Sequence, residues 1–398
     1  MTTGTDHATA MGAEGLDRCP IMPTYGAPRI QFVRGQGSWL WDRDGRRYLD
    51  FLSGLAVTSL GHSHPAVADA LADQARTLLH VSNLFGTEPG ADVARTLDRL
   101  LGGGGQVFFS NSGAEANEAA IKLARKWGGH GRYQVVSTYG SFHGRTLATL
   151  HATGQPAKWE AFQPLPDGFR HVAWHDLDAL AAAIDDTVAA VLLEAVQGEG
   201  GVNPASADYL TGVRELCDER DVLLILDEVQ TGLGRTGAWF AHQLAGIRPD
   251  VVTMAKALGN GVPIGACWAS AGVAEAFEPG DHATTYGGQP LAAAAARAVL
   301  AVMEAEDVPA RAQRAGARID EAARTLPHVV GVRGRGLLLG VELDPDDGPV
   351  AGDVATAALD AGLVVNAVTP TTLRLAPSLL VTDDEIDTAI EILGSVLA

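Results

Sequence analysis

Lysine is scarce in this chain of 398 residues and occurs only at positions 122, 126, 158 and 256. Lysine and arginine together number 29 against 48 acidic residues, so the formal net charge is -19. A chain this short of positive charge is a poor candidate for binding nucleic acid or an anionic membrane surface. The acidic excess indicates solubility and points to no particular partner.

Cysteine is also rare, with Cys19, Cys217 and Cys267 scattered along the chain. Three widely spaced cysteines exclude a disulfide framework and a paired-cysteine metal site, and they suit the reducing cytosol. No apolar run approaches the roughly 18 residues needed to span a bilayer. Residues 1–20 lack the basic start and apolar core of a secretory signal. We therefore expect a flexible tail at residues 1–20 and a cytoplasmic protein.

Apolar residues, in contrast, are plentiful, since 46% of the chain is hydrophobic and 19% is charged. This composition can bury a large core, divided over about two or three domains. Residues 37–52, GSWLWDRDGRRYLDFL, alternate apolar and polar residues around Asp44-Gly45. That pattern predicts a hairpin near the N-terminus.

Helical stretches alternate with short apolar runs from about residue 64 to residue 300. The helical stretches include HPAVADALADQARTLLH and EANEAAIKLARKWG, and the apolar runs are QVFFS, YQVVS, AAVLLEAV, VLLILD and DVVTMA. This alternation predicts an α/β fold in which a mostly parallel sheet is wrapped by helices.

The chain after residue 300 has a different pattern. A long helical stretch leads to VVGVRGRGLLLGVEL, a further helix, TTLRLAP and a last helix that opens with Thr382 and Glu385 at capping-box spacing. A smaller α+β domain fits this order. We therefore divide the chain into a tail (1–20), an N-terminal segment of the small domain (21–60), a large domain (61–300) and a C-terminal small domain (301–398).

One apolar run ends in two carboxylates. Residues 223–237 read LLILDEVQTGLGRTG, so a buried strand is predicted to end at Asp227 and Glu228. Ligands of parallel sheets bind just beyond the carboxyl ends of the strands. Asp227 is therefore either a structural cap or a partner for a cationic group, and this run by itself leaves both readings open.

The four lysines differ in their surroundings. Lys122 and Lys126 lie four apart on a predicted helix, and Lys158 lies in a polar stretch, so all three are expected to be solvated surface groups. Lys256 follows an apolar strand, precedes a glycine-rich loop and has no carboxylate within five residues. A desolvated lysine has a lowered pKa and becomes nucleophilic. The alternative is a lysine whose ammonium reaches solvent from a strand end.

Asp227 and Lys256 each close an apolar strand at the same predicted sheet edge. Pyridoxal phosphate requires such a pair, with a lysine for its aldehyde and an acid for its pyridine nitrogen. It also needs an anion site for its phosphate. QVFFSNSGAEANEAAIKLAR provides a strand, a small polar turn and a helix that begins near Gly113, whose free backbone N–H groups suit a phosphate. An ordinary strand-to-helix turn is the alternative.

Two other motifs have a simpler interpretation. Gly232, Gly234 and Gly237 have the spacing of a dinucleotide fingerprint, but DEVQ and a threonine separate them from the strand. No acidic strand end follows about 20 residues later, so we reject that reading. His62 and His64 lack a supporting cluster of cysteine or histidine and are interpreted as structural residues. We expect no metal site.

Ordered blocks along the chain resemble the class III pyridoxal-phosphate aminotransferases from about Tyr25 to the C-terminus. These blocks are YLDFLSGLAVTSLGHSHP, NSGAEANEAAIKLAR, SFHGRTLATLHATG, VQGEGGV, LLILDEVQTGLGRTG, the stretch around Lys256, TTYGGQPLA and LRLAP. The resemblance implies a fold-type I homodimer whose active site is shared between subunits. It also implies transfer of an amino group from N-acetylornithine to 2-oxoglutarate. Ornithine, succinylornithine, diaminobutyrate and 4-aminobutyrate are the alternative amino donors.

The resemblance assigns cofactor contacts by position. Lys256 would carry pyridoxal phosphate as a Schiff base, and Asp227 would pair with the pyridine nitrogen. Gln230 would lie by the phenolic oxygen, and Phe142 would stack on the ring. The remaining implied contacts are Gly113, Ala114, Glu228, Val229 and, reaching across from the second subunit, Thr285.

The resemblance also assigns the substrate contacts. Arg145 would bind the α-carboxylate of the acylated substrate, with Thr284 nearby. Arg374 would bind the α-carboxylate of glutamate or 2-oxoglutarate, and Glu199 would pair with Arg374 when that ligand is absent. The chain departs from the usual residues of the family at Ala114, Ala195, Thr284, Tyr286 and Gln289. Ala114 replaces a threonine and so removes a possible hydroxyl donor to the phosphate.

Overall fold

The computed structural model describes residues 20–398. The predicted flexible tail, apart from Pro20, and Cys19 therefore lie outside the described residues. Within residues 20–398, no helix is long and apolar enough to cross a membrane.

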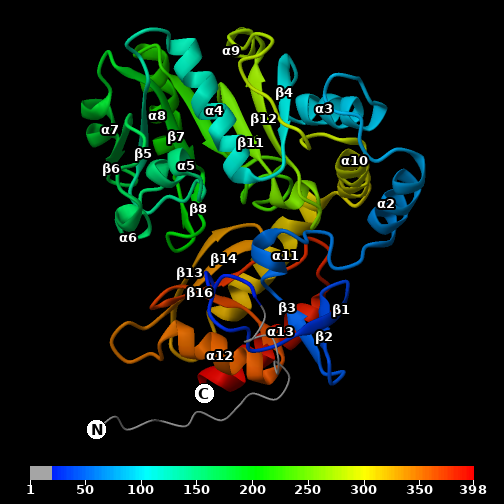
Figure 1. Ribbon diagram of the computed structural model, residues 1–398. Coiled ribbons are helices and arrows are strands. Elements are labelled where there is room, and N and C mark those ends of the chain that lie inside the picture. Colours follow the sequence, from blue (N-terminus) through cyan, green and yellow to red (C-terminus); the bar gives the residue numbers. More distant parts are fainter. Residues whose placement is uncertain (1–19) are drawn as a thin grey trace.

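A seven-stranded sheet with the order β4-β12-β11-β10-β7-β5-β6 forms the upper half of the molecule in Figure 1. Its strands are β4 (Gly105–Ser110), β5 (Gln134–Thr138), β6 (Phe169–Val172), β7 (Val188–Glu194), β10 (Leu223–Asp227), β11 (Val251–Met254) and β12 (Gly265–Ser270). Neighbouring strands from β11 to β6 are parallel, which confirms the prediction of a mostly parallel sheet. β12 runs antiparallel to both β11 and β4 and was not predicted, because GACWAS carries few strand-forming residues.

Both faces of this sheet are covered by helices. Leu223 and Ile225 of β10 pack in one apolar cluster with α4 (Gly113–Gly128), whereas Leu224 and Leu226 pack in another with α7 (Leu177–Ala183) and α8 (Ala207–Glu219). Successive strand residues point to opposite faces, so a strand covered on both sides must be apolar throughout. This explains the uninterrupted run that precedes Asp227.

The C-terminal part forms a four-stranded sheet with the order β13-β14-β17-β16 and three helices. These elements are α11 (Val308–Ala323), β13 (Val329–Arg335), β14 (Leu338–Leu343), α12 (Ala351–Ala361), β16 (Asn366–Thr369), β17 (Thr372–Leu375) and α13 (Asp383–Leu397). The predicted capping box of α13 is present, since the side chains of Thr382 and Glu385 each accept the backbone N–H of the other.

The N-terminal hairpin is joined to this C-terminal part. β1 (Phe32–Gln36), β2 (Trp39–Asp42) and β3 (Arg47–Asp50) form an antiparallel meander, which confirms the hairpin around Asp44-Gly45. β15 (Leu363–Val364) then pairs in parallel with β3. This pairing is consistent with the expectation that residues 21–60 belong to the small domain.

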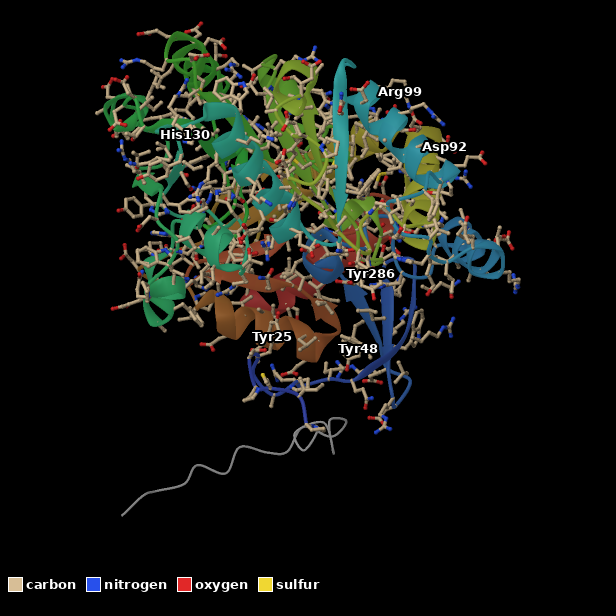
Figure 2. All side chains as sticks on the ribbon, turned by 45° about the horizontal axis from the view of Figure 1, so that its top comes forward. Tyr25, Tyr48, Asp92, Arg99, His130 and Tyr286 are labelled. Carbon is tan, nitrogen blue, oxygen red and sulfur yellow. The ribbon has the colours of Figure 1, made fainter. Side chains whose placement is uncertain are left out.

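Three helices pack together beside the edge strand β4 of the large sheet (Figure 1). α2 (Pro65–Thr77) and α3 (Glu88–Leu100) pack on α10 (Pro290–Ala305), and Asp92 and Arg99 of α3, labelled in Figure 2, form ion pairs with Arg297 and Glu304 of α10. The expected single helical stretch after residue 300 is instead two helices, because Asp307 adopts a φ of 46° between α10 and α11. The predicted boundary at residue 300 falls inside α10, and the division into domains stays a prediction.

Short elements complete the described chain. They are α1 (Ser53–Ala56), α5 (Leu147–Ala152), α6 (Pro156–Trp159), η1 (Glu160–Phe162), β8 (Val196–Gln197), β9 (Asn203–Pro204), η2 (Ala241–Ala245), η3 (Lys256–Leu258) and α9 (Ala271–Ala274).

Candidate active site

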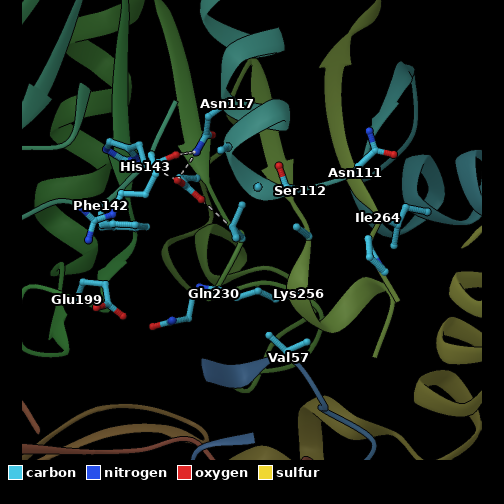
Figure 3. Close-up of a pocket in the computed structure, with 18 of the residues that line it drawn as sticks. Val57, Asn111, Ser112, Asn117, Phe142, His143, Glu199, Gln230, Lys256 and Ile264 are labelled. Carbon is cyan, nitrogen blue, oxygen red and sulfur yellow. Dashed lines mark hydrogen bonds and ion pairs between the residues drawn. The ribbon is translucent and has the colours of Figure 1, made fainter. Parts of the chain in front are cut away.

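A pocket of about 390 Å³ lies beyond the carboxyl ends of β7, β10 and β11. Figure 3 shows that its walls come from segments far apart in the sequence, including Val57, Phe142, Glu199 and Lys256. The sheet edge predicted to hold a ligand therefore does carry a cavity, and both Asp227 and Lys256 line it.

Asp227 ends β10 at the base of the pocket and is 4% exposed. Its Oδ1 accepts the backbone N–H of Val229 at 3.0 Å. Its Oδ2 lies 2.8 Å from Nδ2 of Asn117 and 2.9 Å from Nδ1 of His143. A carboxylate has about four acceptor positions, so one position is left for a donor inside the pocket.

Lys256 begins η3, separated from the end of β11 by one residue, and lines the same pocket. Burial lowers the pKa of its ammonium, and the charge of Arg374 lowers it further, against the opposing carboxylates of Asp227 and Glu199. Its φ of 37° is uncommon for a residue other than glycine. Backbone strain of this kind clusters at functional sites, which favours the functional reading over a lysine reaching out to solvent.

The other cofactor contacts implied by position divide into two groups. Gly113, Ala114, Phe142, Val229 and Gln230 all line the pocket. α4 begins at Gly113 as predicted, with Ser112 as its cap. The backbone N–H groups of its first turn have no acceptor inside the helix and suit an anion. A side chain at position 113 would place its Cβ 2.8 Å from Val229, so only glycine allows this close contact.

Glu228 is the exception, because its side chain does not reach the pocket. Its carboxylate accepts the backbone N–H groups of Ala241 and His242 at 3.0 Å and lies 3.0 Å from Nδ1 of His242. Strand alternation turns Glu228 away from the face that Asp227 occupies. The side chain therefore anchors η2, and the implied cofactor contact of Glu228 is not supported by its position.

Two arginines implied to bind carboxylates occupy different environments. Arg145 is exposed and lines the pocket, and across residues 20–398 it forms no ion pair. Arg374 on β17 is 0% exposed, and its Nη1 lies 2.6 Å from Oε1 of Glu199 and 3.3 Å from Oε1 of Gln230. Burial raises the pKa of Glu199, but Arg374 outweighs this effect and lowers it. The structure thus places Glu199 against Arg374 as the resemblance implied.

Thr284 and Thr285 do not line the pocket of their own chain. Oγ1 of Thr284 accepts a 3.4 Å hydrogen bond from Asn111, and the backbone oxygen of Thr284 accepts one from Asn83 at 3.0 Å. Thr285 is exposed. The implied contact of Thr285 with a cofactor therefore requires a second copy of the chain.

The expectation that three lysines are solvated surface groups holds for Lys122 and is only partly met by Lys126 and Lys158, which are both half-buried. Lys122 is exposed, and Lys126 forms ion pairs with Glu278 and Asp281 at the surface. Lys158 is half-buried, with its Nζ 5.6 Å from the centroid of the Phe142 ring. The polar residues around Lys158 gave no indication that α6 brings it near the Phe142 ring.

Asn117, His143 and Glu194 line the pocket but were not singled out as candidates. A signal for Asn117 existed, because it is a polar residue within the apolar face of α4. His143 and Glu194 are buried through contacts between distant segments, and Glu194 Oε2 accepts the backbone N–H of Phe142 at 3.0 Å. Nothing local in the sequence predicts those contacts.

Glu194 gives the site a pH-dependent contribution to stability. Burial raises its pKa from 4.5 to about 7, helped by the charge of Asp227. Between these two values the folded chain holds a proton that the unfolded chain has lost, so stability falls as pH rises through this window and is level above it. At about 1.4 kcal/mol per pKa unit, the loss is about 3 kcal/mol.

We expect Glu194→Gln to remove most of this slope. In the cofactor-free proteins, the thermal midpoint of the variant should rise relative to that of the parent chain as the pH increases from 5 to 7.5. The reason is that glutamine carries no proton to lose. Differential scanning calorimetry at several pH values measures the effect. Parallel pH profiles for the two proteins would show that Glu194 is ionised throughout.

The two rejected motifs have structural roles. Arg235 of GLGRTG is buried and donates to the backbone oxygens of Leu337 and Pro377, while turns rather than a helix follow its glycines. His62 Nε2 lies 2.7 Å from Asp50 Oδ2. No group of three or more potential metal ligands occurs within residues 20–398.

Comparison with known proteins assigns the family, since the model of the class-III aminotransferases matches residues 22–397. The chain belongs to this family. It is 50% identical to the acetylornithine aminotransferase of Corynebacterium efficiens over 95% of each chain. Among solved structures, N-acetylornithine aminotransferase of Stenotrophomonas maltophilia is similar with a TM-score of 0.81 and 39% identity, over 93% of this chain and 96% of that one.

A solved ornithine aminotransferase of Toxoplasma gondii, whose active site holds PLP at partial occupancy, is similar with a TM-score of 0.90 and 35% identity. The match covers 96% of this chain and 92% of the T. gondii chain. Class III aminotransferases depend on pyridoxal phosphate, and the pocket of this member fits that cofactor. Asp227 retains an acceptor position, Lys256 has a lowered pKa, and the first turn of α4 provides an anion site.

Proposed function

We propose that the chain transfers the side-chain amino group of N-acetylornithine to 2-oxoglutarate, giving N-acetylglutamate 5-semialdehyde and glutamate, as a step in arginine synthesis. The names of relatives such as that of C. efficiens support this donor. Ornithine, succinylornithine, diaminobutyrate and 4-aminobutyrate are the alternative donors, and ornithine is named in the T. gondii structure.

The observation that carries the proposal is a pair of arginines that differ in exposure: Arg145 lines the pocket, and Arg374 lies behind Glu199 and Gln230, which line it. N-acetylornithine presents an amine remote from its carboxylate, whereas glutamate presents an amine adjacent to one. Arg145 is exposed and suits the remote carboxylate. Arg374 is buried and masked by Glu199 and suits the adjacent one. Nη2 of Arg374 has no partner within the described chain, so a donor is ready for that second carboxylate.

Pyridoxal phosphate supplies an aldehyde that takes up the amino group and a ring that withdraws electrons from the reacting carbon. Lys256 would hold the aldehyde carbon, and its Nζ would move a proton between the substrate carbon and the cofactor carbon. Asp227 would hold a proton on the ring nitrogen, while Asn117 and His143 keep its carboxylate in place. Phe142 would pack on the ring, and Gly113 and Ala114 would bind the phosphate.

The two arginines should serve different half-reactions. Arg374→Ala should lower the specificity constant for glutamate by at least about 30-fold, because a buried arginine–carboxylate contact is lost. Arg145→Ala should lower the constant for N-acetylornithine by about 10- to 100-fold. Its effect on glutamate should be smaller, because glutamate keeps the Arg374 contact. Single-turnover absorbance of the bound cofactor measures each half-reaction separately.

Equal damage to both half-reactions by each variant would contradict the two-cation reading and leave only a general aminotransferase. If the parent chain transfers the amino group of ornithine faster than that of N-acetylornithine, the proposed donor is wrong. A panel of the alternative donors with 2-oxoglutarate as acceptor decides this point.

We also propose that the chain works as a homodimer. Leu84, Phe85 and Tyr286 are 87%, 68% and 68% exposed, and Asn83 ties their two segments together through hydrogen bonds to Thr284 and Gly287. Large apolar side chains gathered at a surface indicate a covered interface. Such an interface beside Thr285 is consistent with a contribution of that residue to the active site of the second subunit. Analytical ultracentrifugation of the purified chain tests this association.

A cytoplasmic location remains our proposal for this enzyme. Cys217 and Cys267 are both free and buried, as expected of a chain kept in a reducing compartment. Fractionation of cells that produce the chain would test the location, and recovery outside the cytoplasm would contradict it.

A further inference from the structure

A second cation lies near the Phe142 ring that Arg145 also approaches. Lys158 lies on α6, and its Nζ is 5.6 Å from the centroid of the Phe142 ring. The guanidinium carbon of Arg145 is 5.5 Å from the same centroid. Phe142 and Arg145 both line the pocket. An ammonium and a guanidinium therefore share one aromatic ring of the active site.

Hydrogen bonds hold the segment that carries Lys158 against the Phe142 segment. Nε2 of Gln155 donates to the backbone oxygen of Ser141 at 2.9 Å. Nε1 of Trp159 donates to the backbone oxygen of Thr153 at 2.9 Å. Since Ser141 directly precedes Phe142, the Gln155 bond holds the chain before Lys158 against the Phe142 segment, and the Trp159 bond holds α6 against Thr153.

The charge of Lys158 has no counter-ion in the part of the chain that is described. Lys122 and Lys126 contact the segment around Asp281, whereas Nζ of Lys158 has no hydrogen bond or ion pair within residues 20–398. Burial lowers the pKa of Lys158, and the charge of Arg145 lowers it further, while Glu199 opposes both effects. A half-buried cation with a second cation nearby is stabilised when an anion binds between them, because the anion offsets both the lost hydration and the repulsion.

We propose that Lys158 binds the donor carboxylate that lies remote from the reacting amine, together with Arg145. A carboxylate has acceptor positions for both groups. Arginine contributes a planar fork, whereas lysine contributes a compact charge that can adjust to it. Lys158 is then a specificity-determining residue for amino donors with a distant carboxylate. With N-acetylornithine as that donor, the assignment rests on the proposed function.

The test compares Lys158→Met, which keeps the apolar stem, with Lys158→Arg, which keeps the charge. Lys122→Met is the matched control, because Lys122 is exposed on α4. In single turnovers of the holoenzyme, Lys158→Met should raise the half-saturating concentration of N-acetylornithine by about 10-fold or more. Its limiting rate should be unchanged, because a contact far from the reacting atoms contributes uniform binding. Lys158→Arg should restore most of the loss.

Equilibrium binding provides a readout that needs no turnover. N-acetylnorvaline is N-acetylornithine without the reacting amine, and its carboxamide also lacks the negative charge. In calorimetric titrations of the holoenzyme, Lys158→Met should raise the dissociation constant of N-acetylnorvaline by about 10-fold. The dissociation constant of the carboxamide should not change. Equal weakening of both ligands, or a fall in limiting rate without a change in half-saturation, would show that Lys158 only supports Phe142.

The outcomes separate this inference from the proposed function. If the parent enzyme turns over N-acetylornithine and Lys158→Met matches it in both assays, the Lys158 assignment is wrong and the function stands. If the parent enzyme fails with N-acetylornithine, the same variants are compared with 5-aminopentanoate, which carries a distant carboxylate and no acyl group. A higher half-saturating concentration of 5-aminopentanoate in Lys158→Met than in the parent enzyme would support the carboxylate contact. An unchanged half-saturating concentration would overturn it.

Discussion

Lys256→Ala should lower transamination by at least about 10,000-fold while the chain stays folded, because general acid–base transfer alone contributes up to about that factor. Its Nζ is the group in the pocket that can both hold the cofactor aldehyde and move a proton at the substrate carbon. Burial lowers its pKa and favours the neutral, nucleophilic form. Steady-state turnover with N-acetylornithine and 2-oxoglutarate measures the loss.

Two controls show whether the chemistry of Lys256 or only its charge matters. Lys256→Arg keeps a cation in the pocket but cannot lose a proton at working pH, so it should be as inactive as Lys256→Ala. Lys122→Ala changes an exposed lysine and should retain turnover. Substantial transamination by Lys256→Ala would refute the assignment of this lysine.

Asp227→Asn should slow the chemical step by about 1,000-fold while the cofactor stays bound, because a preorganised charge at the ring nitrogen is removed. Asparagine can still accept the N–H of Val229, but its neutral amide lacks the negative charge that keeps a proton on a ring nitrogen. Both half-reactions use the same ring, so both should slow alike. This symmetry distinguishes the variant from changes at Arg145 or Arg374, and single-turnover rates with each donor measure it.

Glu228→Gln is the matched control, because Glu228 is the neighbouring buried carboxylate but faces η2 instead of the pocket. We expect a lower thermal midpoint for this variant with a nearly normal rate per bound cofactor. A chemical step that is equally slow in both variants would indicate general damage to the β10 edge and would refute the specific role of Asp227.

Local patterns predicted much of the fold and the two central site residues. The apolar run at residues 223–226 predicts a strand covered on both faces, and its abrupt end predicts a carboxylate at a sheet edge. The capping box of α13 and the hairpin around Asp44-Gly45 were predicted for the same reason, since their interactions join residues close in sequence. The strand β12 was missed because its small residues become a strand only between two neighbours that pair with it.

Placement of side chains around the pocket could not be predicted in this way. Asp227 contacts Asn117 and His143 from two other segments, and Glu199 meets Arg374 across 175 residues of chain. The sequence around each of these residues does not indicate its partner, because each contact depends on how distant elements pack. Lys158 and Glu228 show the same limit. Lys158 was expected in solvent and lies half-buried near Phe142, and Glu228 was expected at the cofactor and contacts His242 instead.

The sequence by itself determined the parallel sheet, the strand ends that carry Asp227 and Lys256, the helix start at Gly113 and, through its ordered motifs, the family. These depend on periodicity, turn chemistry and spacing along the chain. The tertiary structure alone decided which side chains share the pocket, which arginine is masked by a carboxylate and which is open, and which lysine lies near the Phe142 ring. Burial and charge pairing set those properties, and both arise only when segments remote in sequence pack together.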